Sequence, residues 1–379
     1  MTGEALRVGV IGVSGIGRGH LFAASMLSDY ELAAVCDVAD AARDKAAIDF
    51  QATPFADAEH LFVSGAVDAV VIATPPSFHG HLVRAAIGAG LHVYCEEPLV
   101  PTATEGYELG RRATEAGRVV QVGLQHRFQH SYVKARALVE EGAIGEVFRA
   151  DVLATNSFRS QHYFDAAPWR AQWRMAGGGA LISQAIHQVD TYISMVGLPA
   201  RVTAHARRAR HRMEVEDDLM AMVEFDSGAR GTLVTSTVDP VGFDRISLHG
   251  EHASLVAEGF ALRRATFAGP AQQLSDESEA DFDTVAVGWE ELHEPSGPSE
   301  WFDLLLDCHR DFVAAIREGR PPRNHPGEAS RSLELINAAY LSAVTGEPVA
   351  LPLAPGAYEA VYEQLCSGAA QLPVSEAAS

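Results

Sequence analysis

The sequence predicts an α/β protein with an N-terminal doubly wound parallel sheet and a C-terminal α/β domain carrying a large, mostly antiparallel open sheet. Three observations predict this fold class. Short apolar runs alternate with helical patterns from residue 6 to about residue 125, as in βαβ units. A glycine-rich turn follows the first apolar run. Beyond residue 125 strand-like runs follow one another closely, which favours antiparallel pairing.

The N-terminal part alternates the two kinds of segment. Expected strands lie at Leu6–Ile11, Glu31–Cys36, Ala69–Ala73, His92–Cys95 and Val119–Val122. Expected helices lie at Ile16–Leu27, His81–Ala89 and Thr104–Ala116. Strands separated by helices in this way pair in parallel, because each helix carries the chain back to the same end of the sheet.

The C-terminal part is expected to combine helices with a run of strands. Expected helices lie at Tyr132–Glu141, Ala180–Met195, Trp301–Glu318 and Pro326–Val344. Expected strands lie at Val147–Ala154, Arg201–His205, Leu219–Phe225, Arg230–Ser236, Arg245–His249 and Ser254–Glu258. Residues 271–300 contain no lysine or arginine and many acids, which predicts a solvated connection with edge strands. Residues 366–379 are expected to form a flexible tail.

Composition and charge limit the classes of partner. The 379 residues suit two domains, and 47% apolar residues can form a sizeable core. A net charge of −21 repels phosphate backbones and anionic lipids, so we expect neither nucleic acid nor membrane as a partner. The four scattered cysteines form no CxxC pair, and residues 1–6 lack the layout of a secretory signal. We therefore expect a cytoplasmic protein without a metal site.

The first expected strand ends in a glycine-rich turn, GVSGIG. The common dinucleotide fingerprint is G-x-G-x-x-G, in which the first glycine makes the tight turn and the last allows close helix–strand packing. Gly12 and Gly17 fill those two positions, whereas Ser14 replaces the middle glycine. Gly15 adds an open backbone before Ile16, where the helix begins. The N–H groups of this helix start would hold a pyrophosphate.

Asp37 ends the second expected strand, twenty residues after Gly17. An acid at this place in a βαβ unit hydrogen-bonds the hydroxyls of the adenosine ribose. Its carboxylate would repel a 2′-phosphate, and Val38, Ala39 and Asp40 supply no arginine. The combination predicts NAD as the cofactor, in preference to NADP.

Several longer segments resemble the Gfo/Idh/MocA oxidoreductases, the family of glucose–fructose oxidoreductase and inositol dehydrogenase. Val67–Leu99 contains the family's TPxxxH segment and ends at its E-K-P position. Val122–Phe128, VGLQHRF, resembles the link into the second domain, and Pro168–Asp190 resembles the tryptophan–arginine segment with the G-G-G…H…D helix. The resemblance continues through DSGARGTL, RISLHG and EASRSLELINAAYLSAVTGEPVALP.

The resemblance implies a Rossmann domain, residues 1–126, and a substrate-binding and oligomerisation domain, residues 127–365. It implies hydride transfer between a nicotinamide and the carbon of an alcohol or carbonyl, on a sugar, sugar derivative or cyclitol. The open sheet would pair subunits into homodimers or homotetramers. Further cofactor-binding residues follow from the matching motifs: Thr74, Pro75, His79, Glu96, Gln125, Trp169 and Arg170.

The position of the family's catalytic lysine, the middle of E-K-P, is Glu97 in this chain. Only Lys45 and Lys134 are lysines, and neither lies in an active-site motif. An ionised carboxylate cannot stabilise a developing alkoxide. Three interpretations stay open: alcohol or carbonyl chemistry with an atypical proton path, imine reduction or amine oxidation with Glu97 stabilising an iminium, and a non-catalytic nucleotide-binding homologue.

A second departure lies in the helix after Gly177–Gly179. The family often has an aspartate four residues before its histidine, whereas this chain has Ser183 before His187. An i, i+4 spacing would place both on one helical face, and a histidine transfers protons near neutral pH. We therefore expect His187 as the proton-transfer residue, assisted by Ser183 and Glu97.

The remaining candidates have less specific signals. Arg127, His162 and Tyr163 are expected to contact the substrate; a salt bridge is the alternative role for Arg127, and simple packing is the alternative for the loop residues. His20, just after the glycine turn, is expected to be a helix residue near the cofactor without a chemical role. The arginines between residues 201 and 212 are expected on an intersubunit or solvated face.

Overall fold

The structure, a computed structural model, describes residues 4–281, 285–295, 297 and 300–374. The chain divides into two compact units. The first unit comprises Met1–Gln125, Arg174–Gly177 and Pro298–Leu333, and the second comprises His126–Trp173, Gly178–Gly297 and Glu334–Ser379. The first crossing lies between residues 125 and 126, beside the boundary expected from the sequence. Two later segments return to the first unit, however, and the sequence did not indicate this.

The first unit contains a six-stranded parallel sheet in the order β3-β2-β1-β4-β5-β6, which confirms the doubly wound prediction. Its strands are β1 (Leu6–Ile11), β2 (Tyr30–Cys36), β3 (Thr53–Phe55), β4 (Ala69–Ile72), β5 (His92–Cys95) and β6 (Val120–Val122). All four residues of β4 have no exposed surface. A strand covered on both faces needs such a continuous apolar run.

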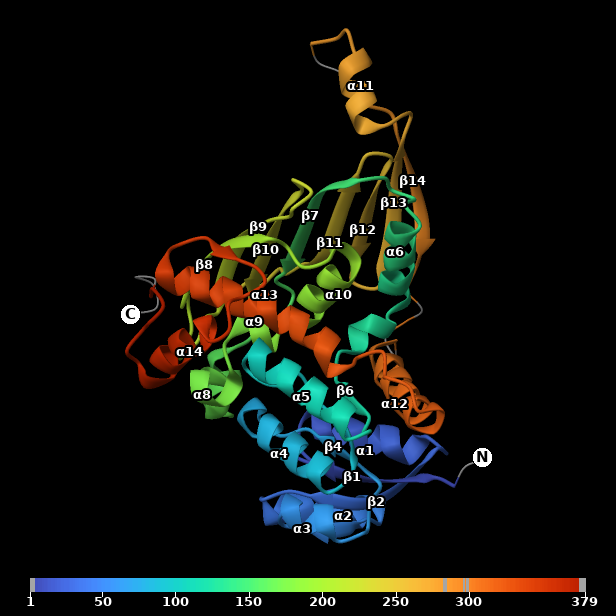
Figure 1. Cartoon of the computed structure of the whole chain (residues 1–379), viewed down its shortest axis with the longest axis vertical. Helices are drawn as coiled ribbons and strands as arrows, with labels where there is room; N and C mark the ends of the chain where they lie inside the picture. The colour runs from blue at the N-terminus through green and yellow to red at the C-terminus, as the bar shows by residue number, and fades with distance from the viewer. Residues whose placement is uncertain (1–3, 282–284, 296, 298–299, 375–379) are drawn as a thin grey trace. The chain divides into compact units, whose positions relative to one another are not determined.

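Helices of the first unit follow the strands, as Figure 1 shows in blue and cyan. They are α1 (Ile16–Met26), α2 (Asp40–Phe50), α3 (Ala58–Val63), α4 (Pro76–Gly88) and α5 (Ala103–Glu115). A sixth helix, α12 (Glu300–Glu318), comes from much later in the chain and packs against α1. Leu305 and Leu306 of α12 form a buried cluster with Ala23 of α1. Apolar contact therefore holds α12 in this unit.

The second unit contains a nine-stranded mixed sheet in the order β14-β13-β12-β11-β7-β10-β9-β8-β15. All pairs are antiparallel except β7 with β10. The strands are β7 (Val147–Ala154), β8 (Arg201–Arg207), β9 (Asp218–Glu224), β10 (Arg230–Ser236), β11 (Asp244–Gly250), β12 (Ala253–Glu258), β13 (Ala261–Phe267), β14 (Val287–His293) and β15 (Val349–Ala350). The mostly antiparallel sheet is confirmed, and β14 forms one of its edges.

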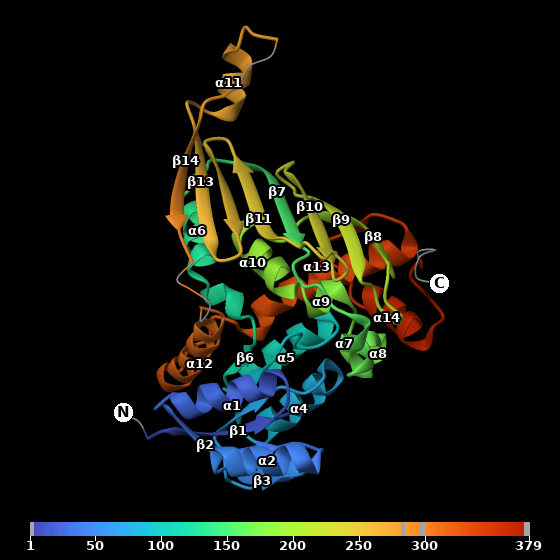
Figure 2. The same cartoon turned by 180° about the vertical axis from the view of Figure 1, so that it is seen from behind.

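Helical elements of the second unit contact one face of this sheet, as α6, α9 and α10 do (Figure 1). The elements that include residues of this unit are η1 (Gln125–Phe128), α6 (His130–Glu140), α7 (Gln161–Asp165), η2 (Pro168–Ala171), α8 (Trp173–Ala176), α9 (Ala180–Ser183), α10 (Ile186–Val196), α11 (Ala271–Glu277), α13 (Pro326–Thr345) and α14 (Ala357–Ser367). The other face is visible in Figure 2. On β9, Met220 and Met222 are exposed while Leu219, Ala221 and Val223 are buried, the two-residue period of a sheet with one open face.

The helix expected at Ala180–Met195 and the expected C-terminal tail both differ from the structure. The continuous helix Ala180–Met195 is wrong: it is divided into α9 and α10, because the N–H of Ala185 donates to Ala180 O five residues back and interrupts the i→i−4 ladder. The tail expected to be flexible from residue 366 is placed as far as Val374. Leu372 is buried, and the N–H of Arg208 donates to Pro373 O. Residues 375–379 lie outside the described part.

Among the described residues, no helix is long and apolar enough to cross a membrane.

Candidate functional site

The glycine turn follows β1 with a geometry that other residues could not adopt. Gly12 has φ +84°, and a Cβ there would lie 2.5 Å from Ala73 O. A Cβ on Gly17 would lie 1.8 Å from Gly12 O. A side chain at either position would therefore displace backbone, which only glycine avoids. The turn brings the start of α1 against the carboxyl end of β4, where the loop of Thr74 begins.

The start of α1 is open to an anionic ligand. Gly15 caps the helix without a side-chain hydrogen bond, the first turn has no acid, and no atom lies within 4 Å of the position a Cβ would take. Ser14 and Gly15 are both exposed. Backbone N–H groups at a helix start carry a partial positive charge, so this turn can bind a phosphate group.

Asp37 lies directly after β2 and is partly exposed. Its Oδ2 accepts from the N–H of Val13 at 3.0 Å, and its Oδ1 accepts from the N–H of Ala39 at 2.9 Å. The carboxylate is thus fixed beside the glycine turn. Each oxygen retains a further lone pair for a hydroxyl donor.

The loops after β4 and β5 are joined by His79. Its Nδ1 lies 2.9 Å from Pro98 O and its Nε2 lies 2.7 Å from Thr74 O. The ring is fully buried, and burial lowers its pKa while the two carbonyl contacts oppose that shift. This geometry gives His79 a supporting role for the loop that carries Thr74 and Pro75.

Glu96 and Glu97 follow β5. Glu96 is 7% exposed, and its Oε1 lies 2.7 Å from Nε2 of His20. His20 is fully buried in α1 and contacts His309 of α12. Sequence reasoning assigned His20 no chemical role and missed His309, whose partner lies 289 residues away. Glu97 is partly buried, with Oε2 shielded from solvent.

Gln125 ends the first unit and is 6% exposed. Its Oε1 is buried and accepts no hydrogen bond within the described part of the chain. A buried acceptor of this kind is costly unless a bound molecule supplies a donor. Together with the open start of α1 and the fixed Asp37, it means that the first unit fits a dinucleotide.

The second unit brings His187 together with a histidine that sequence reasoning did not identify. The ring of His126 stacks on that of His187 with centroids 4.6 Å apart. Burial, and secondarily the charge of His187, hold the pKa of His126 well below its ordinary value. Ser183 donates from Oγ to Gly179 O at 2.7 Å, and the end of α9 separates it from His187. No signal in the local pattern pointed to His126.

Arg127 has the salt-bridge role that was the alternative for it. Its Nε and one Nη donate to the two carboxylate oxygens of Asp190 at 2.6 and 2.7 Å. The side chains are 11% and 1% exposed. A bidentate pair of this kind fixes η1 to α10, and thereby the backbone on both sides of the stacked histidines.

The loop residues expected at the substrate form a cationic group around Tyr163. The guanidinium carbons of Arg159 and Arg170 lie 5.0 and 4.1 Å from its ring centroid. Arg170 also lies 5.3 Å from the ring centroid of Trp169. His162 is exposed. These contacts place Trp169, Arg170 and Tyr163 together and leave His162 at the surface.

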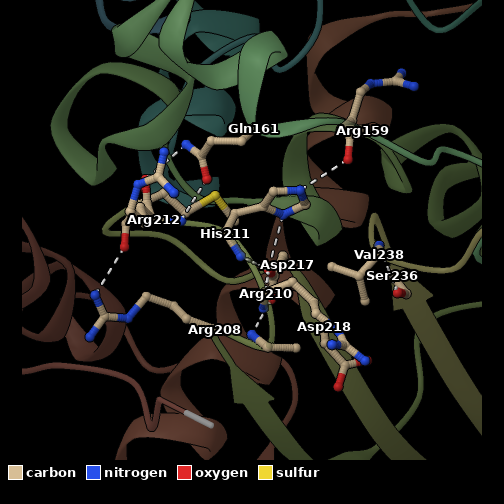
Figure 3. A network of polar contacts seen from close by, with 12 residues as sticks. Arg159, Gln161, Arg208, Arg210, His211, Arg212, Asp217, Asp218, Ser236 and Val238 are labelled. Carbon is tan, nitrogen blue, oxygen red and sulfur yellow. Dashed lines mark hydrogen bonds and ion pairs between the residues drawn. The ribbon is translucent and has the colours of Figure 1, made fainter. Parts of the chain in front are cut away.

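The arginine-rich segment after β8 is organised by a buried acid, Asp217 (Figure 3). Its carboxylate accepts from the backbone N–H groups of Ala209, Arg210 and His211 and from the ring of His211. Nε2 of the His211 ring lies 2.9 Å from Arg159 O, a carbonyl oxygen that can only accept. Internal ion pairs and backbone contacts therefore occupy this segment. Among the described residues, no group of three or more potential ligands could hold a metal ion.

The fold and the first unit's nucleotide features define a dinucleotide-binding oxidoreductase. The profile described as "Oxidoreductase family, NAD-binding Rossmann fold" matches residues 6–124, and the profile of the GFO/IDH/MocA C-terminal domain matches residues 132–256. The chain therefore belongs to the Gfo/Idh/MocA oxidoreductases and is an NAD(P)-dependent oxidoreductase.

Characterised relatives are similar over most of the chain. D-xylose 1-dehydrogenase (NADP(+)) 2 of Haloferax volcanii is 27% identical over 90% of this chain and 99% of its own. The scyllo-inositol 2-dehydrogenase (NAD(+)) of Bacillus subtilis is 27% identical over 75% of this chain and 78% of its own. The WlbA dehydrogenase of Bordetella pertussis, solved with NADH and UDP-GlcNAcA, is 25% identical with a TM-score of 0.78, covering 93% of this chain and 100% of its own.

Proposed function

We propose that this oxidoreductase transfers a hydride between NAD and a carbon of a sugar, sugar derivative or cyclitol. The observation that carries the proposal is the glycine turn held by Asp37 beside the joined β4 and β5 loops. The named activities of the xylose and inositol dehydrogenases support the substrate class. A bound nicotinamide supplies or accepts the hydride, and the chain's residues bind both reactants and move the proton.

We place the pyrophosphate at Gly12–Gly17 and the adenosine ribose at Asp37. The nearest basic side chain on α2, Arg43, is already paired with Asp40 and Asp44 at 2.7 and 2.9 Å. It has no free charge to offer a 2′-phosphate, and Asp37 would repel one. These two features support NAD in preference to NADP.

We assign the proton transfer to His187. The stacked His126 is neutral at ordinary pH, so it does not oppose a positive charge on His187. Burial raises the pKa of Asp244, and the charge of His187 opposes that rise, so the two groups interact favourably when both are ionised. Asp244 also accepts from Gln188 at 3.1 Å. His187 can therefore gain and lose a proton without help from a lysine at position 97.

The test compares the wild type with His187→Asn and Glu97→Lys in NAD(H) turnover against sugars, cyclitols and cyclic imines. We expect sugar or cyclitol turnover by the wild type and a loss of about 100-fold in kcat for His187→Asn, since positioned acid–base groups contribute on this scale. His249→Asn, on β11 with a hydrogen bond to Ser254, is the control.

Three outcomes would contradict the assignment. Imine reduction that is lost in Glu97→Lys would make Glu97 a recognition group for an iminium. Full activity of His187→Asn would move the proton path elsewhere. Binding of NADH without turnover of any substrate would favour a non-catalytic homologue.

We further propose a homodimer or homotetramer through the open face of the nine-stranded sheet. Phe148, Met220, Met222 and Trp289 are 46%, 54%, 62% and 57% exposed on these strands. Apolar side chains in such a position mark an interaction surface. Light scattering that gave a monomer at micromolar concentration would contradict it.

Four free cysteines, three of them buried, support a cytoplasmic location, which fractionation of the producing cells would test.

A further inference from the structure

A chain of four buried polar side chains runs through the first unit from β5 to β2. Glu96 Oε1 lies 2.7 Å from His20 Nε2, and His20 Nδ1 lies 2.9 Å from His309 Nε2. His309 Nδ1 lies 3.1 Å from the hydroxyl of Tyr30. Both histidines are fully buried, and Glu96 and Tyr30 are each 7% exposed. We call these four residues the relay.

The proton positions in the relay follow from its two ends. Burial, and secondarily His20, hold the pKa of His309 well below its ordinary value, and burial raises that of Tyr30, so both are neutral. Because a carboxylate only accepts, His20 donates to Glu96 from Nε2. A singly protonated His20 then accepts at Nδ1 from His309 Nε2, and His309 accepts at Nδ1 from the hydroxyl of Tyr30. All three bonds point toward the carboxylate, and such aligned bonds strengthen one another.

The surroundings of the relay keep it fixed and dry. The ring of Tyr94 stacks on His309 with centroids 4.8 Å apart, and His20 packs edge-on against Tyr94 at 5.0 Å. A Cβ on Gly123 would lie within 3.1 Å of both carboxylate oxygens of Glu96, so glycine makes room for the carboxylate. The charge of Glu96 also acts on four fully buried titratable side chains, those of Tyr94, Cys95, Cys308 and His79.

The position of Glu96 connects this arrangement with the cofactor. Glu96 follows β5 at the carboxyl end of the sheet, and His79 joins the adjoining loop at Pro98 to the loop at Thr74. In open parallel sheets, ligands bind outside this end of the strands, near the point where strand order reverses. Here that point lies between β1 and β4. The nicotinamide carries a positive charge when oxidised and none when reduced.

We propose that His20, His309 and Tyr30 are positioning residues that hold Glu96 as an ionised acceptor beside the nicotinamide. The negative charge of Glu96 then strengthens the binding of NAD⁺ more than that of NADH. The proposal rests on the proposed function for the placement of the nicotinamide. It adds a thermodynamic role for three residues that need not contact either reactant. A carboxylate near a cation lowers the free energy of the charged form, and a protonated carboxyl does not.

The test measures dissociation constants of NAD⁺ and NADH by calorimetry from pH 5.5 to pH 8 in the absence of substrate. We expect Glu96→Gln to weaken NAD⁺ about 10-fold more than NADH, the scale of one partly screened charge pair. His309→Phe removes the donor to His20 but keeps an aromatic ring against Tyr94. We expect it to change the NAD⁺/NADH ratio about 3- to 10-fold, because Glu96 then loses part of the hydrogen-bond chain that holds it.

Two matched variants separate charge control from simple support. His309→Gln retains an N–H donor near the place of Nε2 and should restore most of the ratio, whereas Tyr30→Phe removes the last donor alone and should change it about 2-fold. Arg7→Gln, at a half-exposed ion pair with Asp68, should leave the ratio unchanged. Equal weakening of NAD⁺ and NADH in Glu96→Gln and His309→Phe would overturn the proposal.

A second readout needs no cofactor. Nitrogen-15 spectra of histidine-labelled protein should show His20 and His309 as neutral rings protonated on Nε2, with both signals changed in Tyr30→Phe. A doubly protonated ring, or Nδ1 protonation of His20, would overturn the relay. If the wild type binds both cofactors but turns over no sugar, the substrate assignment fails. The ratio of the NAD⁺ and NADH dissociation constants still tests the proposal for the relay. If it binds neither cofactor, both proposals fail.

Discussion

The two units stabilise their buried acids in different ways. In the first unit, Glu96 depends on neutral side chains that extend from α1 to α12 and β2. In the second unit, Glu216 accepts from the N–H groups of Gly179 and Leu181 and from Tyr340, and Asp190 is paired with Arg127. The difference teaches that a buried acid can be compensated by polarised neutral groups, by backbone amides or by a full countercharge. Each of these has its own cost when it is broken.

The most severe way to break the first unit is steric. Gly17→Ala would place a Cβ 1.8 Å from Gly12 O, so we expect a loss of about 4 kcal/mol or more in the free energy of unfolding and no measurable NADH binding. Gly88→Ala is the matched control on α4, because a Cβ there meets nothing within 4 Å. Urea unfolding should show Gly88→Ala stabilised by about 0.5–1 kcal/mol. Similar losses in both variants would refute the explanation.

The countercharge of the second unit can be compared directly with one of the first. Arg127→Met leaves the 1%-exposed Asp190 without its guanidinium, and we expect a loss of about 3–5 kcal/mol in the free energy of unfolding. Arg7→Met breaks a pair with Asp68 whose side chains are 42% and 40% exposed, and should cost under about 1 kcal/mol. Denaturant titrations at matched pH measure both. If Arg7→Met lost as much free energy of unfolding as Arg127→Met, burial would not explain the cost of breaking the ion pair.

The backbone-compensated acid gives a smaller effect that depends on pH. Burial raises the pKa of Glu216 to about 7 from 4.5, despite its hydrogen bonds. Because the folded pKa lies above the unfolded one, the contribution of Glu216 to stability is full below about pH 4.5 and is lost as pH rises through 7. The free energy of unfolding of the wild type relative to Glu216→Gln should therefore fall by up to about 3 kcal/mol between pH 4.5 and pH 8. A difference that is constant with pH would contradict this.

Local pattern predicted most of the regular structure. The strands β1, β5, β7 and β10 begin and end at the expected residues, and a glycine, a polar or an acidic residue follows each of them. β13 was not expected, although it completes the sheet next to β12. The expected helix across Ser183 and His187 was wrong: Ala185 donates five residues back and interrupts the ladder, and α9 before the break is held at its start by Glu216, 35 residues away on the chain. Periodicity alone does not contain such a contact.

Long-range partners also limited the prediction of the site. The glycine turn and Asp37 form a local motif, so their proximity could be inferred from spacing, and the contact of Asp37 with Val13 agrees with it. The partners of Glu96 could not be inferred, because His309 reaches it through His20 from a helix that follows the entire nine-stranded sheet except its last strand. His126 was missed for a simpler reason. It lies in the link segment, where a lone histidine carries no periodic signal.

The return of α12 to the first unit has a consequence for biosynthesis. When the ribosome has finished Gln125, the parallel sheet can form, but His309 has not yet been made. At ordinary elongation rates, the wait until α12 emerges is about 10–40 s. During that time Ala23 lacks its apolar cover and His20 lacks its partner His309. The first unit therefore stays without α12 while most of the second unit is translated. A chaperone that binds exposed apolar helix faces could bind α1 throughout that interval.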